Sequence, residues 1–321
     1  MTRLLLTLAL SIAALAGTPA QAAWPDKPVT IVVPFPPGGS TDSLARVLTV
    51  PLQAAFGRTF IVDNRAGATG TIGAGQVKRA APDGYTLLVS SLGPFVIAPH
   101  LIKGMPYDAL KDFDLLTVAV RAPNVLVVPA SSPLKTVADV IAAAKKDPGK
   151  LSYASAGNGS SNHLAGEMLK HAARIDVLHV PYKGGAPALT DLMGGRISYM
   201  LLNTIEVLPH LRSQRLRALA IGAPQRSALL SEVPTMAEAG LPGFEASVWW
   251  GLVAPARTPK EIVAKLNAET KQALANPATR TTLTEMGVVP TPGSAAEFGA
   301  FLKLEVARWS KVIKAAGIQA D

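Results

Sequence analysis

The sequence has no cysteine among its 321 residues. This absence excludes disulfide scaffolds, zinc–thiolate sites, iron–sulfur clusters and thiol nucleophiles, because each of them needs cysteine. Charged residues are also few, at 17%, whereas 49% of the residues are hydrophobic. That balance argues against a disordered chain. The length predicts about two domains.

Long apolar runs are missing too, except for one near the start. Residues 4–16 are almost all apolar or small, but the run is too short to span a membrane. It follows a basic residue, Arg3, and precedes the small-x-small sequence Ala20-Gln21-Ala22. Together these features predict a secretory signal peptide over residues 1–22, cleaved after Ala22. We expect a soluble protein of 299 residues in a bacterial periplasm. The lack of cysteine excludes a bacterial lipoprotein anchor.

The charge balance is basic, with 31 Lys and Arg against 22 Asp and Glu, a formal net charge of +9. The predicted cleavage would lower this charge to +8 by removing Arg3. The basic residues are scattered, and no Arg-rich or basic–aromatic run appears. We therefore expect no nucleic-acid partner. A solvated basic surface of this kind still favours small anions as ligands.

The hydrophobic pattern alternates between strands and helices. A compact β-branched run at residues 29–33 is bounded by Pro28 and Pro34, and apolar residues at helical spacing follow it. Further strands are predicted at residues 60–62, 85–89, 125–128, 151–154, 177–180, 197–202 and 216–221. A helix between two of them opens with Thr136-x-x-Asp139. The order β-α-β-α-β occurs twice, which predicts mostly parallel sheets covered by helices.

The C-terminal third is predicted to be helical. Thr258 to Glu261 and Ser294 to Glu297 both have the sequence of a capping box. The second helix has a wide apolar face that must be buried, and the simplest partner is the N-terminal unit. We therefore predict one discontinuous domain, residues 23–122 plus 251–321, and a second domain, residues 123–250. The chain would cross between them near residues 118–125 and 247–253.

Three Gly-rich loops follow predicted strands and precede predicted helices. They lie at residues 36–42, where Ser40 or Thr41 is expected to cap the helix, at residues 155–163, and at residues 182–187. Glycine lets backbone N–H groups approach a ligand, and a helix N-terminus attracts anions. The loops thus predict an anion site in a cleft between the two units, although each also fits a tight capped turn. Residues 67–75 fit either another cleft loop or close packing.

Motifs for phosphate binding and catalysis are missing. The sequence has no phosphate-binding P-loop, no His-Glu-x-x-His and no Gly-x-Ser-x-Gly. His163 lies near Ser160 and Ser161, where it fits either ligand binding or a hydrogen bond across the loop, and we favour the structural role. His179 is expected to pack. The residues predict no metal site, no cofactor and no catalytic residue.

Ordered motifs run along nearly the whole chain after the predicted signal peptide. They are Trp24-Pro25-Asp26-Lys27-Pro28, Pro34-Phe35-Pro36-Pro37-Gly38-Gly39-Ser40-Thr41-Asp42, Val62-Asp63-Asn64-Arg65-Ala66-Gly67-Ala68, Ala81-Pro82-Asp83-Gly84-Tyr85-Thr86, Gly157-Asn158-Gly159-Ser160, His163-Leu164-Ala165-Gly166-Glu167, His179-Val180-Pro181-Tyr182-Lys183-Gly184, Trp250-Gly251-Leu252 and Ala254-Pro255. With these motifs in this order, the chain resembles the substrate-binding proteins of tripartite tricarboxylate transporters, the Bug proteins of proteobacteria.

The resemblance implies an α/β, two-domain periplasmic binding protein fold, type II-like and of the Venus-flytrap kind. The ligand cleft would lie between the domains, which two crossover segments connect. The resemblance also implies a set of ligand-binding residues drawn from three loops. They are Pro37, Gly38, Gly39, Ser40, Thr41 and Asp42 on one wall, Gly159, Ser160, Ser161 and His163 on the other, and Tyr182 and Gly184 from the third loop. We expect Asp42 to order its loop or meet a positive ligand group, because like charges repel.

The sequence therefore predicts a monomeric periplasmic solute receptor and no enzyme. Its ligand would be a small carboxylated compound, such as a di- or tricarboxylate, an amino acid or an aromatic acid. The receptor would deliver that compound to the integral-membrane permease subunits of a tripartite tricarboxylate transporter. The alternatives are a ligand-sensing receptor for a two-component system and an exported hydrolase that uses His163 with Ser160 or Ser161. Trp249 and Trp250 each fit either the cleft or hinge packing.

Overall fold

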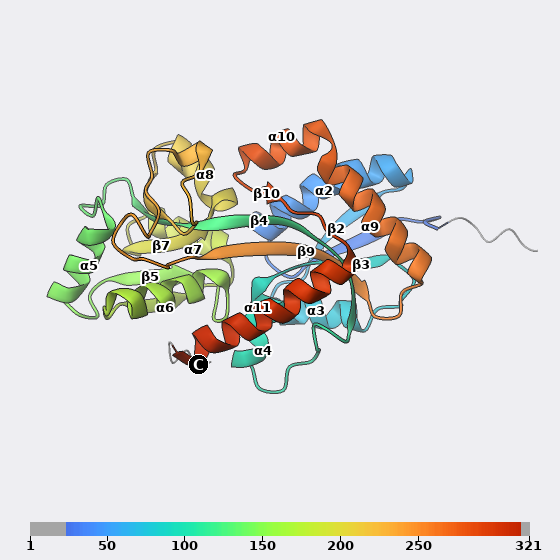
Figure 1. The fold of residues 1–321 in the computed structure, drawn as a ribbon, viewed down its shortest axis with the longest axis horizontal. Helices are drawn as coiled ribbons and strands as arrows, with labels where there is room; N and C mark the ends of the chain where they lie inside the picture. Colours follow the sequence, from blue (N-terminus) through green and yellow to red (C-terminus); the bar gives the residue numbers. More distant parts are fainter. Residues whose placement is uncertain (1–23, 316–321) are drawn as a thin grey trace, which may run out of the picture.

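The computed structural model describes residues 24–315, which form an α/β molecule on two connected groups of strands (Figure 1). The strands are β1 Val29–Val33, β2 Phe60–Asn64, β3 Thr86–Ser91, β4 Phe113–Pro129, β5 Ser152–Ser155, β6 Leu178–Pro181, β7 Tyr199–Asn203, β8 Leu216–Ile221, β9 Ser247–Pro255 and β10 Val289–Pro290. The helices are α2 Ser40–Phe56, α3 Thr71–Lys78, α4 Ala98–Leu101, α5 Val137–Lys146, α6 Ser161–Ala173, α7 Gly185–Met193, α8 Thr204–Arg212, α9 Lys260–Ala275, α10 Pro277–Glu285 and α11 Ala295–Ala315. The predicted signal peptide lies outside the described residues.

The first group of strands follows the order β2-β1-β3-β9-β4. Strands β2, β1 and β3 are parallel, and β1 lies at their centre, with Val29 paired to Phe60 and Thr30 to Thr86. Four of the five residues of β1 are buried, as expected for a parallel strand that is covered on both faces. The strands predicted at residues 29–33, 60–62 and 85–89 are confirmed.

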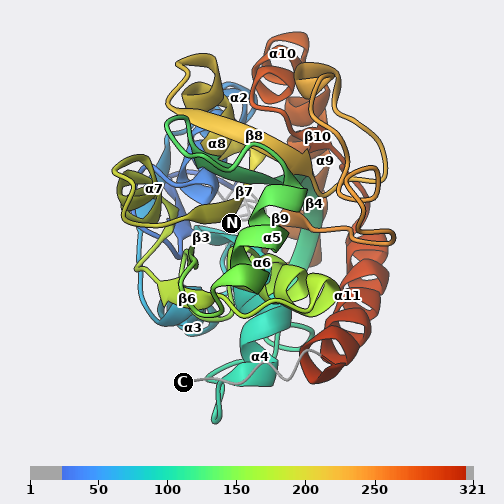
Figure 2. The same cartoon turned by 90° about the vertical axis from the view of Figure 1, so that its left-hand side faces the viewer.

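The second group contains the parallel strands β7, β5 and β6, together with β8. Its two faces have separate cores. Helices α5 and α6 contribute to one core, and α7 and α8 contribute to the other. Figure 2 shows these two pairs of helices in the half of the molecule that faces the viewer. Residues of β4 alternate between the two cores, since Leu126 packs in the first and Val127 in the second.

Two long strands connect the groups. Strand β4 pairs with β9 from Phe113 to Pro123 and then with β7 and β8 from Asn124 to Pro129. Figure 1 shows β4 and β9 running side by side through the middle of the molecule. The segments in which we expected short crossings therefore lie inside two paired strands. The domain boundaries at residues 122/123 and 250/251 remain predictions.

The C-terminal helices pack on the N-terminal strands, as their apolar faces predicted. Leu266 of α9 and Phe298, Leu302 and Trp309 of α11 belong to the same buried core as β1, β3 and β9. The ring of Trp249 meets that of Phe298 edge to face, with centroids 5.6 Å apart. Residues far apart in the sequence thus share one core.

Of the three helix starts predicted from a Thr/Ser-x-x-Asp/Glu sequence, two form the expected cap. Thr136 and Asp139 make a capping box at α5, and the Ser294 hydroxyl accepts from the Glu297 N–H at α11. The box at Thr258 is wrong, because its hydroxyl donates to the Pro255 carbonyl and α9 begins only after Pro259. Helices α8 and α10 were not predicted.

Candidate functional site

A partly open cavity lies where several strands end and the following helices begin. Its empty volume, including open solvent at the mouth, is about 550 Å³. Its lining residues come from both groups of strands. They are Phe35, Pro36, Gly39, Ser40, Thr41, Ser91, Gly93, Ala156, Ser160, Ser161, Asn162, Gly184, Gly185, Ala186, Asn203, Glu206, Val248 and Trp250.

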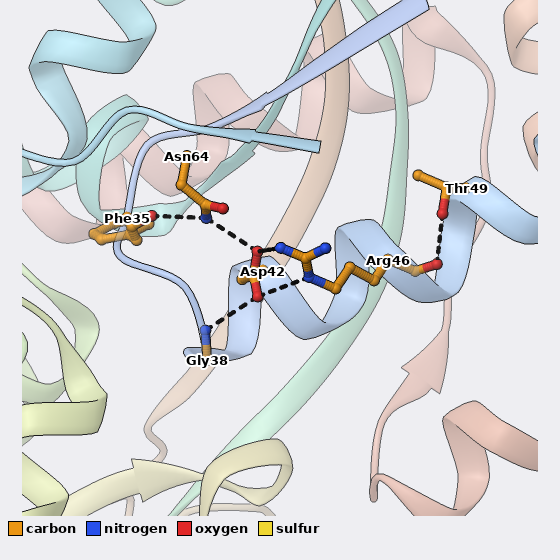
Figure 3. Close-up of polar contacts among 6 residues, drawn as sticks. All are labelled: Phe35, Gly38, Asp42, Arg46, Thr49 and Asn64. Carbon is orange, nitrogen blue, oxygen red and sulfur yellow. Dashed lines mark hydrogen bonds and ion pairs between the residues drawn. The ribbon is translucent and has the colours of Figure 1, made fainter. Parts of the chain in front are cut away.

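The loop between β1 and α2 is held in shape by Asp42 (Figure 3). The Asp42 carboxylate accepts hydrogen bonds from the Gly38 N–H, from the side-chain amide of Asn64 and from the guanidinium of Arg46, each at 3.0 Å. Burial disfavours its charge, but these hydrogen bonds outweigh burial and lower the pKa of Asp42. Asp42 therefore orders the loop, one of the two roles that the sequence suggested.

No side chain of the N-terminal turn of α2 caps this helix. The prediction that Ser40 or Thr41 caps it is wrong, because Gly39 occupies the N-cap position and no side-chain cap bond forms. The Thr41 hydroxyl instead accepts from the indole N–H of Trp250 at 2.9 Å. The first turn of α2 is thereby fixed against β9. Trp250 lines the cavity, whereas the indole N–H of Trp249 donates to buried Glu305.

The loop before α6 is stabilised from within. Ser160 caps α6, because its hydroxyl accepts from the His163 N–H at 3.2 Å. The Nδ1 atom of His163 accepts from the Gly159 N–H at 3.1 Å, and its ring stacks on that of His179. The hydrogen bond across the loop, the role that we favoured for His163, forms in the structure.

Four helix N-termini meet at this cavity. Ser40 begins α2, Ser161 begins α6 and Gly185 begins α7, while Asn203 is the N-cap of α8. Of these helices only α6 has a side-chain cap bond. Each N-terminus carries a partial positive charge and outward-pointing N–H groups, which attract anions. Their convergence makes the cavity suited to a small anionic group.

One acidic side chain stands among these helix ends. Glu206 lies in the first turn of α8, and its Oε1 accepts from the Ser40 N–H at 3.4 Å. Its Oε2 accepts from the Asn203 side-chain amide at 2.9 Å. Burial raises the pKa of Glu206 to about 7, although these two hydrogen bonds oppose the rise. Glu206 is the one ionisable side chain among the described residues that line the cavity.

Glu206 was not predicted as a site residue because α8 was not predicted. The pattern Asn203-x-x-Glu206, directly after a predicted strand, resembles a helix start and was the available signal.

Close approaches between the strand groups surround the cavity. A Cβ atom on Gly184 would lie 3.1 Å from the ring of Pro36, and one on Gly93 would lie 3.2 Å from the Gly159 carbonyl. The Thr69 hydroxyl donates to the Asn158 carbonyl. Residues 66–70 line a neighbouring hollow together with Tyr182. Of the two suggested roles for residues 67–75, close packing is found at Gly73, with its Cβ position 2.9 Å from Pro34, and none of these residues lines the cavity.

The structure divides the predicted ligand-binding residues into two sets of six. Those that line the cavity are Gly39, Ser40, Thr41, Ser160, Ser161 and Gly184. Those outside the lining are Pro37, Gly38, Asp42, Gly159, His163 and Tyr182. Pro37 and Gly38 are exposed, and the hydroxyl of Tyr182 donates to Asp191 at 2.7 Å.

Residues 24–315 contain no cluster of His, Cys, Asp and Glu able to hold a metal ion. Within the same residues no helix has the length and apolar character needed to cross a membrane.

Comparison with known proteins gives consistent matches. Residues 44–318 match the family described as "Tripartite tricarboxylate transporter family receptor". The chain is 38% identical over 320 residues to the protein BugT of Bordetella pertussis, an alignment that covers 99% of this chain and 98% of BugT.

Solved structures match equally well. The chain is similar to R. palustris Rpa4515 with adipate, at 39% identity and a TM-score of 0.90, covering 93% of this chain and 100% of that one. It is also similar to the periplasmic binding protein BugD, at 35% identity and a TM-score of 0.89 with the same coverage. The α/β fold is that of these periplasmic binding proteins.

Proposed function

The chain belongs to the tripartite tricarboxylate transporter family receptors, and on this premise we propose that it captures a small carboxylated compound in the cavity described above. The family consists of solute-binding receptors and not of enzymes, so the hydrolase alternative is rejected. The observation that carries the proposal is the convergence of four helix N-termini, three of them without a hydrogen bond from their own N-cap side chain, on one cavity.

The proposed binding mode uses the first turn of α6 for the ligand carboxylate. Backbone N–H groups of α6 would bind that carboxylate, with the hydroxyl of Ser161 beside them. Phe35, Val248 and Trp250 supply an apolar wall for the carbon chain. The relative crystallised with adipate, a dicarboxylate, supports this class of ligand.

The proposed setting is the periplasm. There the loaded receptor would deliver its ligand, as a monomer, to the membrane permease subunits of a tripartite transporter. The predicted signal peptide and the periplasmic relative BugD support this location.

Thermal shift with a library of carboxylic acids and amino acids tests the proposal. A ligand at 100 times its Kd should stabilise the protein by about 2.7 kcal/mol. The change Gly39→Val should abolish the shift, because the new side chain enters the cavity beside Glu206, 3.8 Å from its Cβ position. Gly299→Val is the matched control, since its Cβ position is also 3.8 Å from the nearest side chain but lies on α11. If no carboxylate shifts the wild type, the proposal is wrong.

A further inference from the structure

The cavity contains a corner with buried hydrogen-bond acceptors, built from Glu206 and Asn203. Both residues line the cavity, and Asn203 is only 3% exposed. The amide Nδ2 of Asn203 donates to the Ser40 hydroxyl and to the Glu206 carboxylate, at 3.2 and 2.9 Å. Its Oδ1 is buried without a hydrogen-bond partner among the described residues. A buried acceptor of this kind is costly unless a donor reaches it.

The orientation of the Asn203 amide follows from this network. The reverse orientation would place Oδ1 against the carboxylate of Glu206, bringing two acceptors together, and would remove the donor that Ser40 Oγ receives. Nδ2 therefore faces Glu206 and Ser40. The oxygen is left as an acceptor.

Glu206 itself also lacks a cationic partner. None of the ion pairs between described residues includes Glu206. Both of its oxygens accept hydrogen bonds, from the Ser40 N–H and from Asn203, an arrangement that suits the ionised carboxylate. The corner thus presents a negative charge and hydrogen-bond acceptors to the cavity, and a ligand that supplies hydrogen-bond donors would complement it.

The position of Glu206 also excludes a second carboxylate nearby. A Cβ atom on Gly185 would lie 2.2 Å from Oε1 of Glu206, and one on Gly39 would lie 3.8 Å from the same atom. The carboxylate of Glu206 therefore occupies the corner between the N-termini of α2 and α7. A ligand carboxylate is directed to the other end of the cavity, at Ser160 and Ser161 on α6.

We propose that Glu206 and Asn203 are specificity-determining residues that bind a primary ammonium group of the ligand, so that this receptor selects amine-bearing carboxylates over dicarboxylates. This inference rests on the proposed function, because it assigns the second end of the same ligand. An ammonium group supplies three N–H donors and one positive charge. These match a carboxylate and an unpaired amide oxygen, and a site built for donors strongly rejects analogues without them.

Matched acids that differ only at their far end test the inference. One set is 3-aminopropanoate, butanoate and succinate, and a longer set is 5-aminopentanoate, hexanoate and adipate. The α-amino acids, with their deaminated analogues, complete the panel. We expect titration calorimetry with the purified protein at pH 8 to show a preference for an amine. In at least one set, the Kd of the amine-bearing acid should be at least tenfold lower than the Kd values of the other acids in that set.

Two variants separate the role of Glu206 from a general charge effect. Glu206→Gln should weaken binding of the preferred amine at least tenfold and reduce its advantage over the dicarboxylate. Glu245→Gln removes one negative charge at an exposed position and should leave the Kd within twofold of the wild-type value. Circular dichroism of each variant checks that the fold is retained.

Each result decides between the two proposals. If a dicarboxylate or a plain alkyl acid binds the wild type most tightly, or if Glu206→Gln leaves the preference for the amine unchanged, the specificity inference is overturned and the proposed function stands. If no member of the panel binds, the proposed function fails together with the inference.

Discussion

The replacement Glu206→Gln should stabilise the empty protein at alkaline pH and leave it nearly unchanged at acidic pH. Burial raises the pKa of Glu206 from 4.5 to about 7. One pKa unit corresponds to about 1.4 kcal/mol, so ionised Glu206 costs at most roughly 3 kcal/mol of folding free energy. The figure is an upper bound, because Glu206 lines the cavity and is only partly buried as a residue.

The sign of the effect follows from proton binding. Between about pH 4.5 and pH 7 the folded protein holds a proton on Glu206 more strongly than the unfolded chain does. The free energy of unfolding therefore falls as the pH rises through this window and stays low above it. A glutamine has no such titration. Its side chain keeps one strong acceptor oxygen, as the protonated carboxyl does, so the lost acceptor at the Ser40 N–H or at Asn203 offsets part of the gain only where Glu206 is ionised.

Melting temperature measured at pH 5, 6, 7 and 8 is a suitable assay. The advantage of Glu206→Gln over the wild type should grow by up to about 5 °C between pH 5 and pH 8. Burial lowers the pKa of His210, in the next turn of α8, but both proteins contain this residue and its effect cancels. The exposed change Glu245→Gln controls for net charge. Parallel pH profiles for the wild type and Glu206→Gln would refute the reasoning.

Two further predictions concern the first turn of α2, beside the cavity. Asp42→Asn should destabilise the protein by about 1–3 kcal/mol at pH 7, because it weakens the hydrogen bonds to Arg46 and Gly38. Since the pKa of Asp42 is lowered, the loss of unfolding free energy measured in urea should shrink as the pH falls below about 4. A loss that does not change with pH would contradict this role of Asp42. Thr41→Val should leave the buried indole N–H of Trp250 without its acceptor, which should lower stability by about 1–3 kcal/mol and change the tryptophan fluorescence. The control Thr282→Val, at an exposed position of α10, should change neither quantity. An unchanged spectrum and melting temperature for Thr41→Val would count against the contact.

Strands were predicted well wherever their burial is visible in the sequence. Residues 29–33 form an uninterrupted apolar run between two prolines, and such a run has few other interpretations. Strand β4 was predicted only in part, because Asp114, Arg121 and Asn124 interrupt its apolar pattern. Its full length depends on pairing with β9, more than a hundred residues away, which no local pattern reveals.

The loops of the site were predictable, but its chemistry was only partly so. Glycines after strands indicated the loops that meet at the cavity, and six of the twelve predicted residues line it. Glu206 was not predicted as a site residue, because Pro209 lies inside α8 and a proline argues against a helix at that position. The contact between Thr41 and Trp250 joins positions 209 residues apart, so only the folded chain brings it about.

Because both groups of strands share β4, the chain cannot be cut there into two halves that each keep a complete sheet. Many two-part proteins can be cut at a linker into halves that are expressed separately. Here a cut between Pro123 and Asn124 would end a strand in mid-sheet and separate β9 from residues Phe113–Pro123 of β4, with which it pairs. A chimaera that exchanges one half for that of a relative must therefore exchange β4 and β9 together, with both junctions placed outside the paired strands.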